Sequence, residues 1–153
     1  MTAPTISRGV KRSATVVGAL LRRGIRLGRL QMLETTGWSS GEPRSVPVAV
    51  IVHDRKRWLV SPFGETDWVR NVRAHPGATL VSGRRREEVN LREVDHEMAA
   101  PVLKRYLQTY RRVPFVPPAF HAQPDSPVTA FLYEAGIHPV FAVCDDSRSL
   151  PCH

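Results

Sequence analysis

The sequence lacks several features that would assign a function quickly, and each absence excludes a class of protein. No apolar run reaches the roughly 18 to 20 residues that a transmembrane helix needs. No G-x-G-x-x-G or P-loop string is present, which excludes Rossmann and Walker nucleotide sites. Arginines interrupt the apolar positions of the N-terminus, so it does not read as a secretory signal. We therefore expect a cytoplasmic protein, with a peripheral position at the inner face of the membrane as an open alternative.

Cysteine is scarce and confined to the end of the chain. Cys144 and Cys152 could close only a short C-terminal loop, so we expect no structural disulfide. The terminal Cys152-His153 pair, even together with Asp145 and Asp146, matches no standard zinc spacing. We therefore expect no metal site.

Acidic residues are outnumbered, with 14 Asp and Glu against 22 Lys and Arg, which gives a formal net charge of +8. So basic a domain suggests nucleic acid as a partner. However, the arginines are scattered, and no helix-turn-helix, zinc-finger or aromatic RNA-binding signature accompanies them. We expect no nucleic-acid partner, and an anionic cofactor and an anionic membrane surface remain as the competing explanations of the charge.

The membrane explanation depends on residues 1–29. Apolar and basic residues alternate over residues 8–29 in the pattern of a basic amphipathic helix. Such a helix could lie on an anionic bilayer or pack on the rest of the protein, and its glycines favour packing because they weaken an isolated helix. We expect three parts: a tail and amphipathic helix at 1–29, one domain at 30–144 and a C-terminal tail at 145–153.

Short β-rich runs dominate the central domain. We expect strands at about 30–36, 46–53, 57–61, 78–83, 87–94 and 137–143. Hairpin turns are expected at 53–56 and 83–85, and helices at 65–75 and 95–110. The proline-rich residues 111–128 suggest an ordered loop or broken helix. Six short strands with helices between them predict an α+β protein built on a small β-barrel.

The first of two segments suited to an anionic, planar ligand is residues 35–48. It reads as a strand, a tight glycine-containing loop and a second strand that carries Arg44. The planar guanidinium of an arginine suits phosphate or carboxylate. The alternative is an exposed hairpin arginine without a ligand.

The second segment is residues 61–77, which read as a loop opening a helix near Gly64. Trp68 and Asn71 are one helical turn apart, so an apolar ring and an amide share one side of this helix. Trp68 at this spacing suits a core position as well as a ligand platform, and the loop from Ser61 could serve only to cap the helix. The amide of Asn71 on an apolar face needs a partner.

These segments resemble the deazaflavin-dependent nitroreductase family of actinobacteria, which are split-barrel oxidoreductases that use coenzyme F-420. The family pattern is TTxGRKSGxPRxxPL, a strand ending in serine, WxxNxxANP and a late hPVF strand. Its counterparts here, spread over about residues 30 to 143, are Thr35-Thr36-Gly37, Ser40-Gly41-Glu42-Pro43-Arg44 with Pro47, Ser61, Trp68-x-x-Asn71 with Ala74-His75-Pro76, and His138-Pro139-Val140-Phe141.

The resemblance implies a split β-barrel of the FMN-binding-like type. It also implies an enzyme that uses coenzyme F-420, an 8-hydroxy-5-deazaflavin, with FMN as the weaker alternative. The reaction would be hydride transfer to an enone, quinone or nitro compound. The resemblance implies that the anionic tail is bound by Arg44 and by the backbone of Ser45, Val46 and Pro47. It implies that Ser61 faces the ring, where it is also a candidate proton donor, and that Pro62, Phe63 and Gly64 lie beneath the ring. The implied cofactor-binding residues on the helix are Trp68, Arg70 and Asn71.

The chain departs from the family pattern at Trp38 and Ser39, where the pattern has arginine and lysine. Arg70 and Arg73 on the following helix are candidates to supply the lost charge. The alternative function is a non-catalytic split-barrel carrier of a lipid, fatty acid or flavin that visits membranes through residues 1–29. We expect a hydrophobic small-molecule substrate, and both a monomer and a homodimer remain open.

Overall fold

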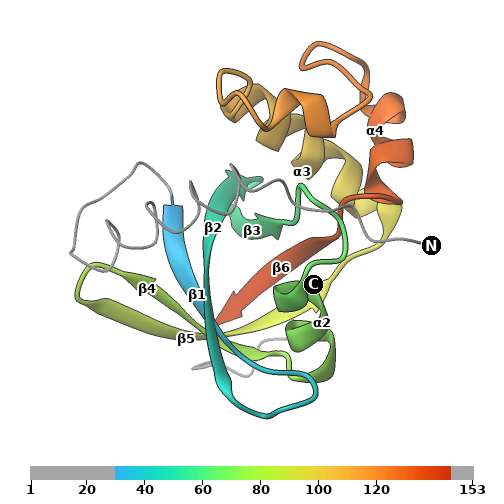
Figure 1. Cartoon of the computed structure of the whole chain (residues 1–153). Helices are drawn as coiled ribbons and strands as arrows, with labels where there is room; N and C mark the ends of the chain where they lie inside the picture. Colours follow the sequence, from blue (N-terminus) through green and yellow to red (C-terminus); the bar gives the residue numbers. More distant parts are fainter. Residues whose placement is uncertain (1–29, 146–153) are drawn as a thin grey trace.

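The computed structural model describes residues 30–145, in which six antiparallel strands close into a barrel (Figure 1). The elements in chain order are β1 (Leu30–Thr36), β2 (Pro43–His53), β3 (Lys56–Val60), α2 (Asp67–Ala74), β4 (Gly77–Ser82), β5 (Arg85–Glu93), α3 (His96–Thr109), the 3-10 helix η1 (Pro117–Ala119), α4 (Val128–Ala135) and β6 (Val140–Asp145). Around the barrel the order is β1-β2-β3-β6-β5-β4, and β4 pairs back with β1.

The predicted barrel is confirmed, and its six strands and two of its helices lie within a few residues of their predicted positions. The expected loop or broken helix at 111–128 contains η1. Helix α4 was not predicted. Cys144 in β6 is disulfide-bonded, whereas we expected no structural disulfide. The predicted amphipathic helix at 1–29 and the residues beyond 145 lie outside the described residues, so the three-part division of the chain remains a prediction.

The barrel interior is filled with apolar side chains that alternate along the strands, as the period of two requires. One side of α2 adds to this core. The interior cluster consists of Leu33, Val48, Val50, Leu59, Leu80, Val89, Leu91 and Phe141 from the six strands and Trp68, Val69 and Val72 from α2. Arg70 and Arg73 lie on the opposite, exposed side of the same helix, which is the amphipathic pattern of a helix that covers a core.

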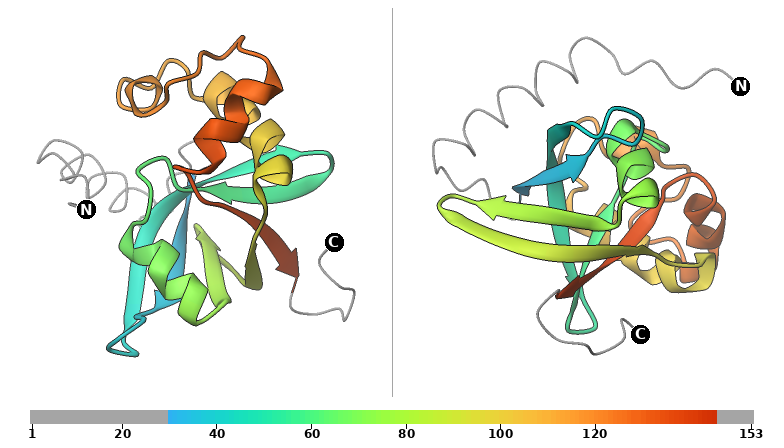
Figure 2. Two further views of the ribbon diagram at one scale, coloured as in Figure 1. Left: turned by 90° about the vertical axis from the view of Figure 1, so that its right-hand side faces the viewer. Right: turned by 90° about the horizontal axis from the view of Figure 1, so that it is seen from below.

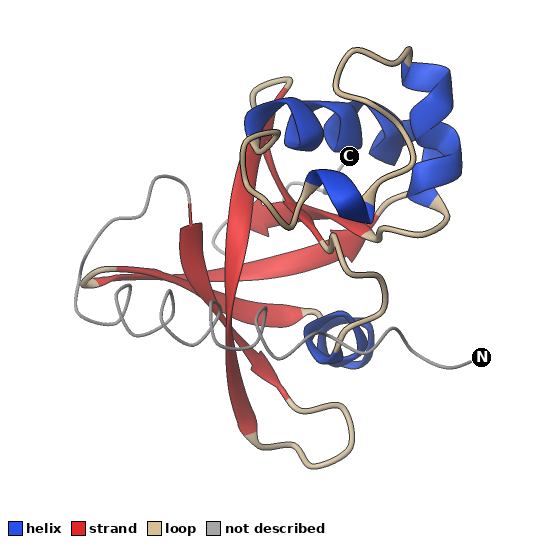
Figure 3. Cartoon of the chain, turned by 45° about the horizontal axis from the view of Figure 1, so that its top comes forward, coloured by secondary structure: helices blue, strands red, loops and turns tan. Residues whose placement is uncertain are grey.

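A second core lies outside the barrel, where α3 and α4 cover β2, β3 and β6. Ile51, Trp58 and Val140 of these strands pack with Leu103 of α3 and Phe131 of α4. Figure 3 shows these two helices together at one end of the sheet, with α2 apart from them. The molecule therefore has two separate apolar clusters, and α2 belongs to the interior one.

Strand β2 has a free edge near α2. Residues 43–49 of β2 pair with β1, whereas β3 pairs only with residues 50–53. No other strand within residues 30–145 pairs with the remaining edge of 43–49. Helix α2 packs against β1 and lies in front of the strands beside the β1–β2 hairpin (Figure 2, left). The two sequence segments of interest both adjoin α2, one through the β1–β2 hairpin and the other through the loop that leads into the helix.

Candidate functional site

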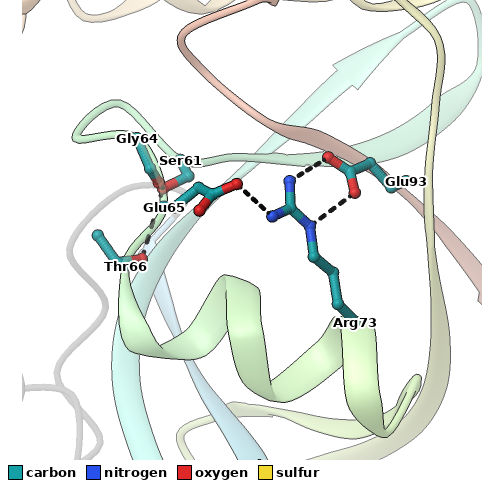
Figure 4. Close-up of polar contacts among 6 residues, drawn as sticks. All are labelled: Ser61, Gly64, Glu65, Thr66, Arg73 and Glu93. Atoms are coloured by element: carbon teal, nitrogen blue, oxygen red, sulfur yellow. Dashed lines mark hydrogen bonds and ion pairs between the residues drawn. The ribbon is translucent and has the colours of Figure 1, made fainter. Parts of the chain in front are cut away.

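The loop that follows β3 is held tightly by Ser61. Its side chain is fully buried, and its hydroxyl donates to the Gly64 carbonyl oxygen at 2.5 Å and lies 3.5 Å from the Thr66 hydroxyl (Figure 4). Its backbone N–H donates to the Pro139 carbonyl at 2.9 Å, which continues the pairing of β3 with β6. Gly64 has φ +80°, a conformation that favours glycine. In this conformation the Ser61 hydroxyl supports the loop rather than facing solvent.

Arg73 ties the same loop to α2 and to β5. Its Nε and Nη2 donate to the two carboxylate oxygens of Glu93 at 2.8 and 2.7 Å, and its Nη1 donates to Glu65 at 2.6 Å (Figure 4). The bond from Arg73, together with its charge, holds the pKa of Glu65 below its usual value. The bond to Glu93 in turn raises the pKa of Arg73. Because two carboxylates already occupy Arg73, the charge that we expected it to offer a ligand is largely neutralised.

Asn71 joins α2 to the β1–β2 hairpin. Its side chain is buried, its Nδ2 donates to the Thr35 hydroxyl at 3.0 Å, and its Oδ1 accepts the Trp38 backbone N–H at 2.9 Å. Thr35 is the register partner of Arg44 across the hairpin. Both ends of the amide are therefore used within the protein, which explains an amide on an otherwise apolar helix face.

The β1–β2 hairpin loop is fixed by its own backbone and open on its outer side. The Gly37 N–H donates to the Glu42 carbonyl at 2.8 Å, and Gly41, with φ +69°, donates back to the Gly37 carbonyl at 2.9 Å. Trp38 is 52% exposed. The exposed side chain of Arg44 makes only a loose ion pair with Glu42, at 3.5 Å. Arg44 is thus free to meet an anionic ligand.

The remaining predicted residues divide by exposure. Trp68 is 7% exposed, and its ring centroid lies 5.4 Å from that of Phe141, so it has the core role that its spacing also allowed. Arg70 is exposed on α2. Along the free edge of β2, Ser45 is exposed, and Val46 and Pro47 are half-buried.

The loop residues Pro62, Phe63 and Gly64 are partly accessible. The Phe63 ring lies 6.2 Å from that of Phe115, in the proline-rich segment before η1. Phe115 is 43% exposed. These two rings give the loop an apolar aromatic surface, which is a suitable neighbour for a flat heterocycle.

A buried acid and histidine behind the loop were not found from the sequence. Glu134 of α4 is fully buried, with Oε1 accepting the backbone N–H groups of His121 at 2.6 Å and Ala122 at 2.8 Å. Its Oε2 lies 3.1 Å from Nε2 of His138. Burial lowers the pKa of His138, against the opposing effects of Glu134 and of the backbone of Pro62 and Ser61. The i,i+4 spacing of a glutamate and a histidine was the available signal.

Comparison with known proteins now identifies the family. A sequence profile of the F-420H(2)-dependent quinone reductases matches residues 7–114. The chain belongs to this family. It is an oxidoreductase, and its cofactor is coenzyme F-420. No curated protein sequence matches the chain.

Solved structures agree with the fold. An F-420-H2 dependent reductase (FDR-A) is 22% identical with a TM-score of 0.52, over 75% of this chain and 93% of that one. A protein described as a domain-swapped dimer is 19% identical with a TM-score of 0.55, over 84% and 94%. General Stress Protein 26 from Bacillus anthracis str. Sterne is 11% identical with a TM-score of 0.51, over 85% and 89%. At these identities the likeness shows the fold alone.

The described residues fit the family cofactor in kind. Exposed Arg44 and Arg70 offer positive charge to an anionic tail, and the surface of Phe63 and Phe115 offers an apolar neighbour for a ring. The free edge of β2 leaves backbone donors and acceptors for a ligand to use. Within residues 30–145, no group of three or more His, Cys, Asp or Glu is placed to hold a metal ion. Nor is any helix there long and apolar enough to cross a bilayer.

Proposed function

We propose that this F-420-dependent reductase delivers hydride to an electron-poor small molecule, with a quinone first and enones or nitro compounds as further acceptors. Membership of the quinone reductase family supports the order of these acceptors. When bound, the deazaflavin supplies the hydride chemistry, and the protein supplies binding and orientation. The site that we assign lies between the free edge of β2 and the loop after β3.

The observation that carries this site is the unpaired edge of β2 over residues 43–49. The pairing of β3 with β2 stops at Val50, so one edge of residues 43–49, which include Ser45, Val46 and Pro47, has no neighbouring strand among the described residues. We assign the anionic tail to this edge, with Arg44 beside it and Arg70 on the helix. Exposed arginines attract a flexible anion by charge, so the atoms need not be placed precisely.

We assign the ring to the loop Pro62, Phe63 and Gly64. Ser61 keeps the loop in place through its bond to the Gly64 carbonyl, and Glu65 keeps its far end on Arg73. A loop that is fixed before binding loses little conformational entropy when the ring docks. Asn71 contributes by holding the hairpin that carries Arg44 against the helix.

Proton delivery to the reduced substrate is assigned to water. Ser61 could donate only if its hydroxyl left the Gly64 carbonyl, because a hydroxyl has one proton to give. A solvent molecule at the open side of the loop needs no such rearrangement.

The test is a binding and turnover comparison on the purified full chain. Oxidised F-420, FMN and haem are titrated and followed by absorbance and fluorescence, and oxidation of reduced F-420 is then measured with a quinone, an enone and a nitroarene. We expect binding of F-420 and fastest turnover with the quinone. Tight FMN binding without F-420 binding would sink the proposal, and F-420 binding without turnover of any acceptor would favour the carrier alternative.

For the assembly we propose a homodimer rather than a monomer, by analogy with the similar structure described as a domain-swapped dimer. Size-exclusion chromatography with light scattering measures the mass directly. A monomeric mass at micromolar concentration would contradict this proposal.

A further inference from the structure

The pair of Glu134 and His138 lies directly behind the loop to which we assign the ring. His138 is 2% exposed and occupies the turn between α4 and β6. Its ring stacks on Phe120, with centroids 4.3 Å apart. The next residue, Pro139, accepts the backbone N–H of Ser61 at 2.9 Å. The imidazole is therefore one residue from the point where the loop leaves the barrel.

One edge of the imidazole is fixed by Glu134. Three donors converge on this carboxylate, namely two backbone N–H groups at Oε1 and the His138 ring at Oε2. Such a set of donors suits a carboxylate that acts only as an acceptor. The hydrogen bond at Oε2 is then donated by the N–H group at Nε2 of His138. The position and orientation of the ring are thereby set by α4.

The other edge of the imidazole points at the loop. The backbone of Pro62 and Ser61 favours the protonated ring, so it lies close to a ring nitrogen. Because Nε2 faces Glu134, that nitrogen is Nδ1, which is buried and has no hydrogen-bond partner of its own among the described residues. A buried polar atom without a partner is rare and calls for an explanation.

We propose that His138 is a positioning residue for the cofactor loop, held at Nε2 by Glu134 and presenting Nδ1 to the backbone of Ser61 and Pro62. A protonated Nδ1 can donate a hydrogen bond to a backbone carbonyl of the loop, whereas a neutral Nδ1 can only accept. The proton on His138 thus decides whether this edge of the ring can hold the loop. This inference rests on the proposed function, because it matters to the reaction only if the loop carries the ring.

Other titratable groups near the pair must be separated from His138. His121, exposed in the segment before α4, has its Nδ1 3.6 Å from Glu134 Oε1. His96 of α3 lies beside Gly136, in the turn that leads to His138. Neither ring is placed against Ser61 or Pro62 by a described contact, so replacement of each by glutamine should leave the loop unchanged.

A matched pair of substitutions tests the two edges of the ring. In His138→Gln the amide reaches the place of Nε2 and keeps the bond to Glu134, but nothing remains at the place of Nδ1. In His138→Asn the amide occupies the place of Nδ1 and faces the loop, but the bond to Glu134 is lost. A purely structural role through Glu134 predicts that His138→Gln rescues every property.

We measure three properties of each full-length variant: the affinity for oxidised F-420 as a function of pH, amide hydrogen exchange of Phe63 and Gly64 without cofactor, and the unfolding midpoint. For His138→Gln we expect a midpoint close to native and a loop that behaves as in the native protein at pH 7.5. Below pH 6.5, as the native ring gains its proton, we expect loop exchange about tenfold faster and F-420 affinity about tenfold weaker than in the native protein, so that the pH profile of the variant is flat. For His138→Asn we expect a lower midpoint with a protected loop.

A His138→Gln protein with native loop exchange and a native pH profile would overturn the proposal. The loop measurement needs no cofactor, so it separates this inference from the proposed function. If the loop loosens in His138→Gln while F-420 affinity is unaffected, the ring site is wrong and the positioning role stands. Should neither variant fold, titration of the native protein by NMR decides, because the Gly64 amide must shift with the same midpoint as the His138 ring, and a Gly64 amide that does not shift overturns the proposal.

Discussion

The two loops beside α2 are built differently, although both carry residues that we assign to one cofactor. The loop after β3 is tied by the buried Ser61 hydroxyl and by Glu65 on Arg73. The β1–β2 hairpin loop is tied at its root through Asn71, and the side chain of Arg44 is exposed with one loose ion pair. A ring needs a shaped surface, whereas an anionic tail needs only nearby charge. The difference in how the two loops are held therefore matches the different parts of the cofactor that we assign to them.

Arg70 and Arg73 show the same contrast within one helix. Arg73 is used by two carboxylates to hold the loop after β3, whereas Arg70 is exposed on the solvent side. One of the two positive charges on this helix, that of Arg73, is therefore used in ion pairs that hold the fold. The net charge of the chain overstates what is available to a ligand.

The largest effect on stability is expected where α2 meets the β1–β2 hairpin. In Asn71→Ala the Trp38 N–H and the Thr35 hydroxyl lose their partner, which should cost about 2 to 3 kcal/mol of unfolding free energy. Arg70→Ala on the exposed side of the same helix should change stability by no more than about 0.5 kcal/mol. Urea unfolding of both variants makes the measurement. Equal midpoints for Asn71→Ala and the native protein would show that the junction carries no stability.

The next effect is expected in the open loop and should appear in binding alone. Arg44→Ala should weaken F-420 binding about tenfold while leaving the unfolding midpoint unchanged, because the side chain is exposed. The loss should shrink as salt is added, since exposed charges are screened.

Arg84→Ala, which removes an exposed charge in the β4–β5 turn, is the matched control for Arg44→Ala. Binding is followed by titration at low and moderate ionic strength. An equal loss of affinity in both variants would mean that the loss comes from net charge and not from the hairpin.

In the loop after β3, Gly64→Ala should cause a smaller loss of stability and a weaker binding of F-420. Alanine at φ +80° is strained by about 1 kcal/mol, and the nearest atom to the added methyl group would be the Ile137 carbonyl oxygen at 3.5 Å, an ordinary contact. Gly83→Ala, at φ +61° in open space, should lose similar stability. We expect only Gly64→Ala to weaken F-420 binding. Equal binding by the two variants would remove the loop from the site.

The smallest expected effect is the pH dependence of stability that His138 causes. Burial lowers its folded pKa below 6.5, so the fold favours the neutral ring. The contribution to stability is complete above about pH 6.5 and is lost as the pH falls through the folded pKa. Thermal unfolding of the native protein and of His138→Phe between pH 7.5 and 5 measures it. A native protein that loses no more stability than the variant would contradict this assignment.

The barrel could be predicted from the sequence because its signals are local. Alternating apolar residues, hairpin turns and the helix start near Gly64 each occupy a few consecutive positions. Helix α4 was missed because it follows a proline-rich stretch without a side-chain cap, and its N-terminal residue is preceded by Pro127. Nothing in residues 128–135 repeats often enough to mark so short a helix.

The site was only partly predictable because its contacts join distant segments. Asn71 was recognised as an amide in need of a partner, yet the partners Thr35 and Trp38 lie more than 30 positions away. Glu134 reads as an ordinary exposed acid until the fold buries it against two backbone N–H groups. Trp68 allowed two interpretations, and only the packed barrel shows where its ring lies.

The position of α2 has a further consequence for the range of substrates. Within residues 30–145, Trp68, Val69 and Val72 pack inside the barrel together with side chains from all six strands. The site that we propose therefore lies outside the barrel, on the outer surface beside α2. For such a site we expect acceptors that share an electron-poor head to be accepted with tails of different length.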